Sequence, residues 1–446
     1  MSHYHPYPAY KDSGVEPVGA VPEHWDVARV ARLGPLQKAN GGSKEDNVES
    51  GVPCIRYGDL YTTHDHWIRH TPTFVAEEKA AEYTPIQHGD VLFAASGETF
   101  EEIGKSAVNL LPDGACCGGD VIGLRPSPAA DPLFLGYALD CSVARVQKAQ
   151  MGKGFTVKHI YADQLRNLLL ALPPVTEQRA IAAALDQETA RIDALIAKKT
   201  EFIGLLAKKR QALIAHAVTK GLDPKAKMRD SGVEWIGEVS AHWTVAPIKR
   251  WFSTTSGATP DTAQQAKYYA PTDGIPWIRT TDLTNGPIAN FEIGITEQAL
   301  SDTACKLIPK NAVLIAMYGG DGTIGKNGLL EIRACINQAI CALLPSRHFV
   351  PEFTFAYVQF YRPHWMISAA STRKDPNISQ EIIRSAAIVR PPEYEQQQIV
   401  AFLKNALRRI DVLAAKTQQS IDLLKQRRSA LITAAVTGQI DIRNPT

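Results

Sequence analysis

An internal repeat with an offset of 218 residues constrains this chain more than any other feature. Asp12-Ser13-Gly14-Val15-Glu16 recurs as Asp230-Ser231-Gly232-Val233-Glu234, and His24-Trp25 recurs as His242-Trp243. At the far end of each copy, 173–219 aligns with 391–437 without a gap, and 23 of these 47 positions are identical. Such a period marks one structural unit written twice. We therefore expect two similar halves related by a pseudo-two-fold axis.

The repeated tails, 173–222 and 391–446, are expected to be long helices. Pro173-Pro174 ends the preceding segment, and Thr176 is the expected helix cap. A heptad line of apolar residues, which is typical of coiled coils, runs along each tail. Its members are Leu185, Ile192, Leu206 and Leu213 in the first copy and Leu403, Ile410, Leu424 and Leu431 in the second. A helix of about 42 residues would be roughly 60 Å long at 1.5 Å per residue.

The bodies that precede these tails, 1–172 and 223–390, diverge between the two copies. Short apolar runs at 90–95 and 312–317 are bounded by glycine and proline, which favours strands. Each body is therefore expected to be a mixed α/β domain, and the whole chain to belong to the α+β class. Two similar but non-identical bodies joined to rigid helices suit a protein that reads two different things at a fixed distance.

Composition excludes several classes of protein. The 48 basic residues nearly cancel the 46 acidic ones, so any nucleic-acid surface must come from local clustering of charge. No apolar run approaches the ~18 residues that cross a bilayer, and the first ten residues contain no apolar leader segment, so we expect no membrane association and a cytoplasmic location. The seven cysteines lack CxxC spacing and are expected to be reduced, buried thiols.

Motifs for catalysis are missing or incomplete. Residues 320–326 fit the pattern of a phosphate-binding loop, but Asn327 replaces the Ser or Thr that would hold magnesium, and the residues after it predict a strand. The sequence has no Asn/Asp-Pro-Pro-Tyr/Phe loop of an adenine methyltransferase and no nuclease constellation. His64 and His66 are expected to be ordinary loop residues and not metal ligands. We therefore expect no catalytic residue, no metal and no cofactor on this chain.

Two longer motifs resemble those of a known family. Each copy opens with K/R-D-S-G-V-E-x-x-G-x-x-x-x-H-W, at 11–25 and 229–243, and closes with P-P-x-x-E-Q-x-x-I-x-x-x-L…R-I-D-x-L, at 173–195 and 391–413. Together they resemble the Type I restriction-modification specificity subunit over essentially the whole chain. Pro17-Val18 in place of Trp235-Ile236, and Ser240 in place of Pro22, are small departures.

The resemblance implies a division of labour among several chains. Each body would be a target recognition domain for one half of a split sequence in double-stranded DNA, and the helices would form an antiparallel coiled coil that sets the spacer. Two methyltransferase (M) subunits carrying S-adenosylmethionine would dock on the helices, and two restriction/translocase (R) subunits using ATP and Mg would complete the complex. This chain would recognise the bipartite site and catalyse nothing itself.

Candidate DNA contacts lie in three regions that recur in both copies. Base edges are read by Arg, Lys, Asn and Gln, and phosphates by Lys, Arg and Ser/Thr. The candidates are Arg56 and Tyr57 with Arg279, Thr280 and Thr281; Lys105 and Ser106 with Lys326 and Asn327; and Lys153, Thr156 and Lys158 with Arg373, Lys374 and Asn377. Each could instead be a solvated loop residue, and Arg56 and Arg279 could equally be ion-pair partners of Asp59 and Asp282.

Two other functions stay open on the sequence alone. A coiled-coil assembly adaptor would use its bodies to bind proteins instead of DNA, and salt-dependent retardation of DNA would exclude it. A self-sufficient methyltransferase would bind S-adenosylmethionine by itself, and the missing catalytic loop argues against that activity.

Overall fold

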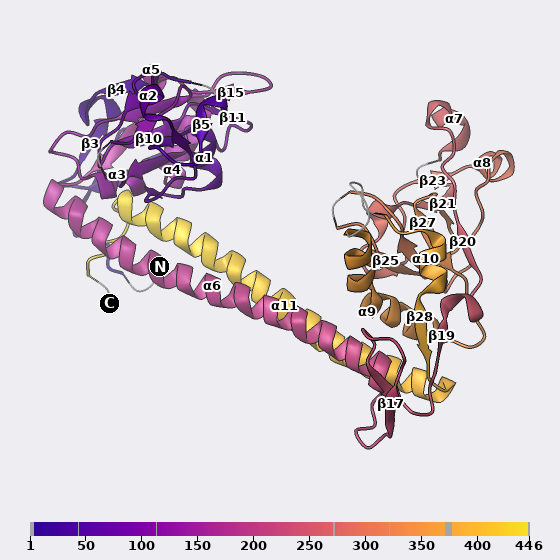
Figure 1. Cartoon of the computed structure of the whole chain (residues 1–446). Helices are drawn as coiled ribbons and strands as arrows, with labels where there is room; N and C mark the ends of the chain where they lie inside the picture. The colour runs from indigo at the N-terminus through magenta and orange to yellow at the C-terminus, as the bar shows by residue number, and fades with distance from the viewer. Residues whose placement is uncertain are drawn as a thin grey trace. The chain divides into compact units, whose positions relative to one another are not determined.

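The computed structural model describes residues 4–42, 44–112, 114–270, 273–320, 322–370 and 377–444. The chain divides into two compact units, Met1–Thr200 with Gln418–Thr446 and Glu201–Thr417. We call them unit 1 and unit 2 and describe each by itself. Each unit contains one body and part of both long helices, α6 (Val175–Lys220) and α11 (Glu393–Val436), which Figure 1 draws in magenta and yellow.

The main sheet of the body has the same strand order in the two units. The order is β4-β14-β10-β12-β7 in unit 1 and β20-β27-β24-β25-β22 in unit 2. Neighbouring strands are antiparallel except at one edge, where β7 and β22 run parallel to their neighbours. The bounds are β4 Leu36–Lys38, β7 Trp67–Ile68, β10 Val91–Ala94, β12 Ser106–Asn109 and β14 Val121–Leu124, and β20 Thr254–Ser256, β22 Gly286–Ile288, β24 Val313–Ala316, β25 Asn327–Leu330 and β27 Ile340–Leu343. The predicted strands at 90–95, 312–317 and after residue 326 are thereby confirmed.

A second sheet also repeats its core arrangement. In unit 1 its order is β5-β8-β6-β13-β9, and in unit 2 it is β23-β21-β26. The parallel pair β6–β13 of unit 1 corresponds to the parallel pair β21–β26 of unit 2. The bounds are β5 Asn47–Val48, β6 Val52–Ile55, β8 Phe74–Val75, β9 Thr84–Pro85 and β13 Cys116–Cys117, and β21 Ile275–Ile278, β23 Gly294–Ile295 and β26 Cys335–Ile336.

Short strand pairs and helices complete the units. The pairs are β1 Tyr10–Asp12 with β2 Ala20–Pro22, β3 Asp26–Arg29 with β16 Leu169–Leu172, β11 Ser96–Gly97 with β15 Lys158–His159, β17 Met228–Asp230 with β18 Glu238–Ser240, and β19 Thr244–Pro247 with β28 Ala387–Arg390. The helices of unit 1 are α1 Tyr57–Thr62, α2 Glu77–Ala80, α3 Pro132–Ala138, α4 Ser142–Met151 and α5 Ala162–Leu165, and those of unit 2 are α7 Gln265–Tyr268, α8 Glu297–Asp302, α9 Pro351–Ala370 and α10 Gln380–Ser385. The 3-10 turns are η1 Val30–Arg32, η2 Lys44–Asp46, η3 Ile248–Arg250, η4 Thr262–Gln264 and η5 Thr280–Asp282.

The two long helices pack antiparallel within each unit. In unit 1 the start of α6 shares a core with the end of α11, through Ile181 and Leu185 with Leu431. In unit 2 the end of α6 shares a core with the start of α11, through Val218 and Leu403. Of the eight predicted heptad residues six are buried, and Leu213 and Leu424 are half-buried. The predicted coiled coil is therefore confirmed, although Thr176 was wrongly predicted as the cap: α6 begins one residue earlier, at Val175.

Two ion pairs cross the helix pair and are related by the repeat. In unit 1, Arg428 Nε lies 3.0 Å from an oxygen of Asp193. In unit 2, Arg210 Nε lies 3.6 Å from an oxygen of Asp411. Adding the offset of 218 to Arg210 and Asp193 gives Arg428 and Asp411. The same interaction is thus made once in each unit, with the roles of the two helices exchanged.

The repeated His-Trp pair binds a glutamate in the first turn of each long helix. In unit 1, His24 Nε2 and Trp25 Nε1 lie 2.9 and 3.2 Å from the carboxylate of Glu177. In unit 2, His242 Nε2 and Trp243 Nε1 lie 2.6 and 2.9 Å from the carboxylate of Glu395. The two motifs that open and close each copy are therefore partners across the fold, and they fasten the body to the helix.

Glu395 makes unit 2 sensitive to acid. Burial opposes its ionisation, but the hydrogen bonds from His242 and Trp243 outweigh burial and hold its pKa below the ordinary value. A carboxyl group with a lowered pKa stabilises the fold above its unfolded pKa of about 4.3 and loses that contribution as the pH falls through the folded value. We expect Glu395→Gln to lower the free energy of unfolding at neutral pH and to flatten its decline below about pH 5. Urea unfolding across that range checks this, with the exposed Glu393→Gln as control; equal pH profiles for the two variants would contradict it.

Two further expectations concern the cysteines and the membrane. All seven cysteines are free and buried, as expected. Among the described residues, no helix is long and apolar enough to cross a bilayer.

Candidate nucleic-acid interface

The first candidate region follows a buried strand in each body. Arg56 precedes α1, and its guanidinium donates to Gly42 O at 3.2 Å, to Asn47 Oδ1 at 2.7 Å and to Tyr83 OH at 3.1 Å. Arg56 therefore fastens the loop at 42–47 to the body, and Tyr57 beside it is exposed.

In unit 2, Arg279 takes the place of Arg56 before η5. It forms an ion pair with Asp282 at 2.9 Å and a second with Glu292 at 3.1 Å. The ion-pair alternative is confirmed for Arg279. Thr280 is half-buried beside it and Thr281 is exposed.

The second candidate region is a glycine turn before β12 and β25. Gly104 and Gly325 have φ of 70° and 68°, a left-handed conformation that favours glycine. Lys105 and Lys326, which follow them, are half-buried, and Lys105 Nζ donates to His64 O at 2.8 Å.

The next residues in this region, Ser106 and Asn327, are buried strand residues with no exposed side-chain surface. Asn327 Nδ2 donates to Gly325 O at 3.0 Å and so closes the turn from inside. Neither side chain belongs to the exposed surface of its body. The lysines are the members of this region that a ligand can reach.

A cation from a neighbouring helix holds the glycine turn in each body. In unit 1, Lys148 Nζ donates to Gly104 O at 2.7 Å and to Leu139 O at 2.9 Å, and its side chain is fully buried. In unit 2, Arg362 donates to Gly322 O at 2.6 Å and to Ile324 O at 3.3 Å. The position of the lysine that follows the turn therefore depends on a cation that the sequence analysis did not select.

The buried charge of Lys148 is balanced by Asp140. The two groups lie 3.5 Å apart, and Arg145 lies 2.6 Å from the same carboxylate. Burial disfavours the charged form of Asp140, but Lys148 and Arg145 outweigh it and keep the pKa of Asp140 below its ordinary value. Burial lowers the pKa of Lys148.

Asp65, His66 and Asp140 lie close enough together to suggest a metal site. One ligand atom from each lies within 4.8 Å of the others. However, Asp140 already neutralises two cations, whose charge opposes a third. The donor set is that of a structural ion cluster, and we keep the prediction that these residues hold no metal.

The third candidate region is the loop before β15. Lys153 and Thr156 are exposed and Lys158 is half-buried, with Phe155 between them at 95% exposure. The corresponding Arg373 and Lys374 lie outside the described residues, and Asn377 is half-buried.

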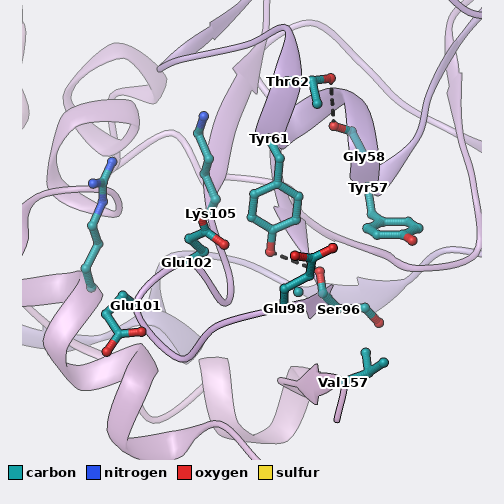
Figure 2. Close-up of a pocket in the computed structure, with 12 residues that line it drawn as sticks. Tyr57, Gly58, Tyr61, Thr62, Ser96, Glu98, Glu101, Glu102, Lys105 and Val157 are labelled. Atoms are coloured by element: carbon teal, nitrogen blue, oxygen red, sulfur yellow. Dashed lines mark hydrogen bonds between the residues drawn. The ribbon is translucent and has the colours of Figure 1, made fainter. Parts of the chain in front are cut away.

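The structure brings parts of the three regions together around a cavity of about 620 Å³ in unit 1. Figure 2 shows Tyr57 and Tyr61 on one side of this cavity, Lys105 on another and Val157 across from them. Tyr61 donates to Ser96 O at 2.9 Å, and Thr62 donates to Gly58 O at 3.0 Å. Three carboxylates, Glu98, Glu101 and Glu102, also line the cavity, so its wall favours hydrogen-bond donors over phosphate.

A second cavity of about 810 Å³ adjoins the first along α1 and has different walls. It contains Tyr57, Gly58 and Thr62 like the first, but its cations are Lys38, Lys44 and Arg56, and Gly41, Gly42, Gly118 and Gly119 also line it. Cations and open backbone amides are the groups that bind phosphate. The two cavities beside α1 therefore differ in charge: three glutamates line the first with Lys105 and Arg145, and three cations line the second with Asp59 and Asp120.

The sequence analysis missed the residues that hold this surface in place. Glu177, Glu395, Lys148 and Arg362 were not selected, because each acts through partners far away in the sequence. The repeat could have identified the two glutamates as partners of the histidines, because His24 and Glu177 are 153 residues apart, as are His242 and Glu395.

Two bodies that share one fold but carry different loop residues are typical of a recognition protein with two binding domains. The chain belongs to the family described as Type I restriction modification DNA specificity domain, which matches residues 22–203 and 242–422. It is 23% identical over 442 residues to the putative type I restriction enzyme MjaX specificity subunit of Methanocaldococcus jannaschii, covering 96% of each chain. It is 21% identical to the EcoKI specificity subunit of Escherichia coli K12, covering 95% of this chain and 90% of that protein.

A solved structure supports the same fold. A chain from the work described as "Structural basis underlying complex assembly and conformational transition of the type I R-M system" superposes with a TM-score of 0.71 at 18% identity. The match covers 93% of this chain and 98% of that one. The resemblance stated from the sequence motifs is confirmed, and no finding favours the assembly adaptor.

Proposed function

We propose that this specificity subunit recognises a bipartite sequence in double-stranded DNA, with one body reading each half-site, and that it catalyses no reaction itself. One observation carries the proposal: the main sheets share one strand order, while the loops around them differ in chemistry. A scaffold repeated to this degree positions its loops in the same way, and differing loops then read different base sequences.

We propose further that two M subunits dock on the helix pair and that two R subunits complete the complex. Each unit leaves one leucine of α6 and one of α11 about half exposed: Leu195 at 48% and Leu423 at 57% in unit 1, and Leu205 at 53% and Leu413 at 43% in unit 2. Under the repeat offset of 218, Leu195 corresponds to Leu413 and Leu205 corresponds to Leu423. A surface made twice suits two copies of one partner. S-adenosylmethionine, ATP and Mg belong to those partners in this proposal.

DNA binding by the exposed cations is expected to depend on salt. Each lysine that neutralises a phosphate contributes about 0.9 to the slope of log affinity against log salt concentration. We expect Lys153→Gln with Lys158→Gln to reduce the magnitude of that slope by roughly 2 and to weaken binding to all sequences about equally. Electrophoretic retardation of the full chain with its M subunit, at several salt concentrations, measures the slope.

The matched control removes two exposed lysines from the segment after α6 instead, by Lys225→Gln with Lys227→Gln. It changes the net charge equally and is expected to leave the slope unchanged. If both pairs change the slope alike, net charge and not the loop binds DNA. If wild-type protein binds no DNA at any salt concentration, the proposed function fails.

A further inference from the structure

One turn of the body keeps its backbone in the two units but changes its side chains. It joins β13 to β14 in unit 1 at 118–120 and β26 to β27 in unit 2 at 337–339. Gly118 N donates to Ile55 O and Asn337 N donates to Ile278 O, each at 3.0 Å. At the last position of the turn, Ala95 N donates to Asp120 O at 2.9 Å and Met317 N donates to Ala339 O at 2.8 Å. The two turns are therefore structural equivalents.

The side chains on this turn differ completely. Unit 1 carries Gly118-Gly119, which line the 810 Å³ cavity together with Arg56. Unit 2 carries Asn337-Gln338 at the same positions, next to the strand that leads to Arg279. One body thus offers bare backbone where the other offers two amide side chains.

The segment that faces the turn changes in step with it. In unit 1 a Cβ added to Gly119 would lie 3.1 Å from Gly41 O, so the two glycine segments touch. The registers of β4 on β14 and of β20 on β27 make Lys38 equivalent to Ser256, and three residues further on Gly41 corresponds in sequence to Thr259. Thr259 Oγ1 donates to Gln338 Oε1. The amide of the exposed Gln338 is therefore oriented by a neighbour before any ligand arrives.

We infer that Gln338 is a base-reading residue of unit 2 that recognises adenine, with Thr259 as its positioning residue. The inference rests on the proposed function. A glutamine amide fits the major-groove edge of adenine, since Oε1 accepts from the N6 amino group and Nε2 donates to N7. Oε1 has two acceptor sites, so the bond from Thr259 leaves one for the base. The neighbouring Asn337 is half-buried and its Oδ1 is a buried atom, so the exposed Gln338 is the amide of this turn that faces outward.

The chemistry of unit 1 excludes the same reading there. Gly118 is buried and Gly119 is half-buried, and neither has a side chain that could distinguish bases. The difference between the turns therefore gives the two half-sites different requirements at one position.

Selection of bound duplexes from a random-sequence library by the full chain with its M subunit tests the inference. Wild-type protein is expected to enrich a split site with an A·T pair at one position of one half-site. Gln338→Ala is expected to accept every base pair at that position, to lower affinity for the wild-type site on the order of 10- to 100-fold, and to leave the other half-site unchanged. Gln338→Glu is expected to shift the preference at that position to cytosine, whose N4 amino group donates to a carboxylate.

Controls separate this inference from the proposed function. Gln298→Ala removes an exposed amide from α8 of the same body and is expected to change neither half-site. Thr259→Val keeps the glutamine but frees its amide, and is expected to weaken the preference for adenine without abolishing it. An unchanged selected sequence for Gln338→Ala, with unfolding like that of wild type, overturns the inference alone. Failure of wild-type protein to enrich any split site overturns the proposed function, and this inference with it.

Discussion

Replacement of Lys148 by methionine is expected to destabilise unit 1 by about 3–5 kcal/mol, the usual cost of removing one partner from a buried charged pair. Methionine is similar in length but cannot donate to Gly104 O and Leu139 O or balance the charge of Asp140. The carboxylate then keeps only Arg145, whose side chain is half exposed. Thermal or urea unfolding followed by tryptophan fluorescence measures the loss.

Two variants decide whether the charge is responsible. Lys148→Met with Asp140→Leu removes both buried charges and is expected to recover most of the stability, because an apolar pair carries no uncompensated charge. Arg362→Met, which removes the corresponding cation from unit 2, is expected to cost less because Arg362 is only half-buried. If the double variant is no more stable than Lys148→Met, the lost hydrogen bonds to Gly104 O and Leu139 O, and not the unbalanced charge, explain the effect.

Lengthening both long helices by four residues is expected to change the spacer of the DNA site and neither half-site. The insertions follow Thr200 in α6 and Gln418 in α11, which are equivalent positions of the repeat. Four residues add about 6 Å and complete roughly one helical turn, so the apolar stripes stay in phase. One helical turn of DNA contains about 10 base pairs and spans about 34–36 Å, so the added 6 Å corresponds to about two base pairs. Sequencing of N6-methyladenine in cells that carry the variant with its partner subunits measures the spacer.

A matched control places the same four residues after Pro224, an exposed position beyond the end of α6. This insertion lengthens the chain without lengthening a helix and is expected to leave the spacer unchanged. An active enzyme whose spacer does not respond to the paired helical insertions would disprove the role of the helices as a ruler.

The sequence predicted the elements whose signal is periodic. The long helices and the buried strands at 90–95 and 312–317 follow from heptad spacing and apolar runs, which depend on neighbours in the chain. The strand order within the bodies was not predicted, because pairs such as β4 with β14 join segments that no local pattern connects.

The candidate site was predicted only in outline, for the same reason. Residues near Arg56, Lys105 and Lys158 do surround one cavity, but no sequence pattern indicates that Glu98, Glu101 and Glu102 share its wall. Asp59 was the nearest plausible partner of Arg56 in sequence. The guanidinium of Arg56, however, contacts Gly42, Asn47 and Tyr83. Burial also removed Ser106 and Asn327 from the surface, because all residues of β12 and of β25 are buried, so that both faces of each strand are covered.

Unit 1 is discontinuous in the chain, and this has a consequence for biosynthesis. Its core contains Ile181 and Leu185 together with Leu431 and Ile440, so the early residues lack their packing partners until 418–446 have left the ribosome. Unit 2 needs only the single stretch Glu201–Thr417. The half of the protein that is translated first is therefore completed last, and a chain released early would keep an apolar stripe exposed, which chaperones and proteases recognise.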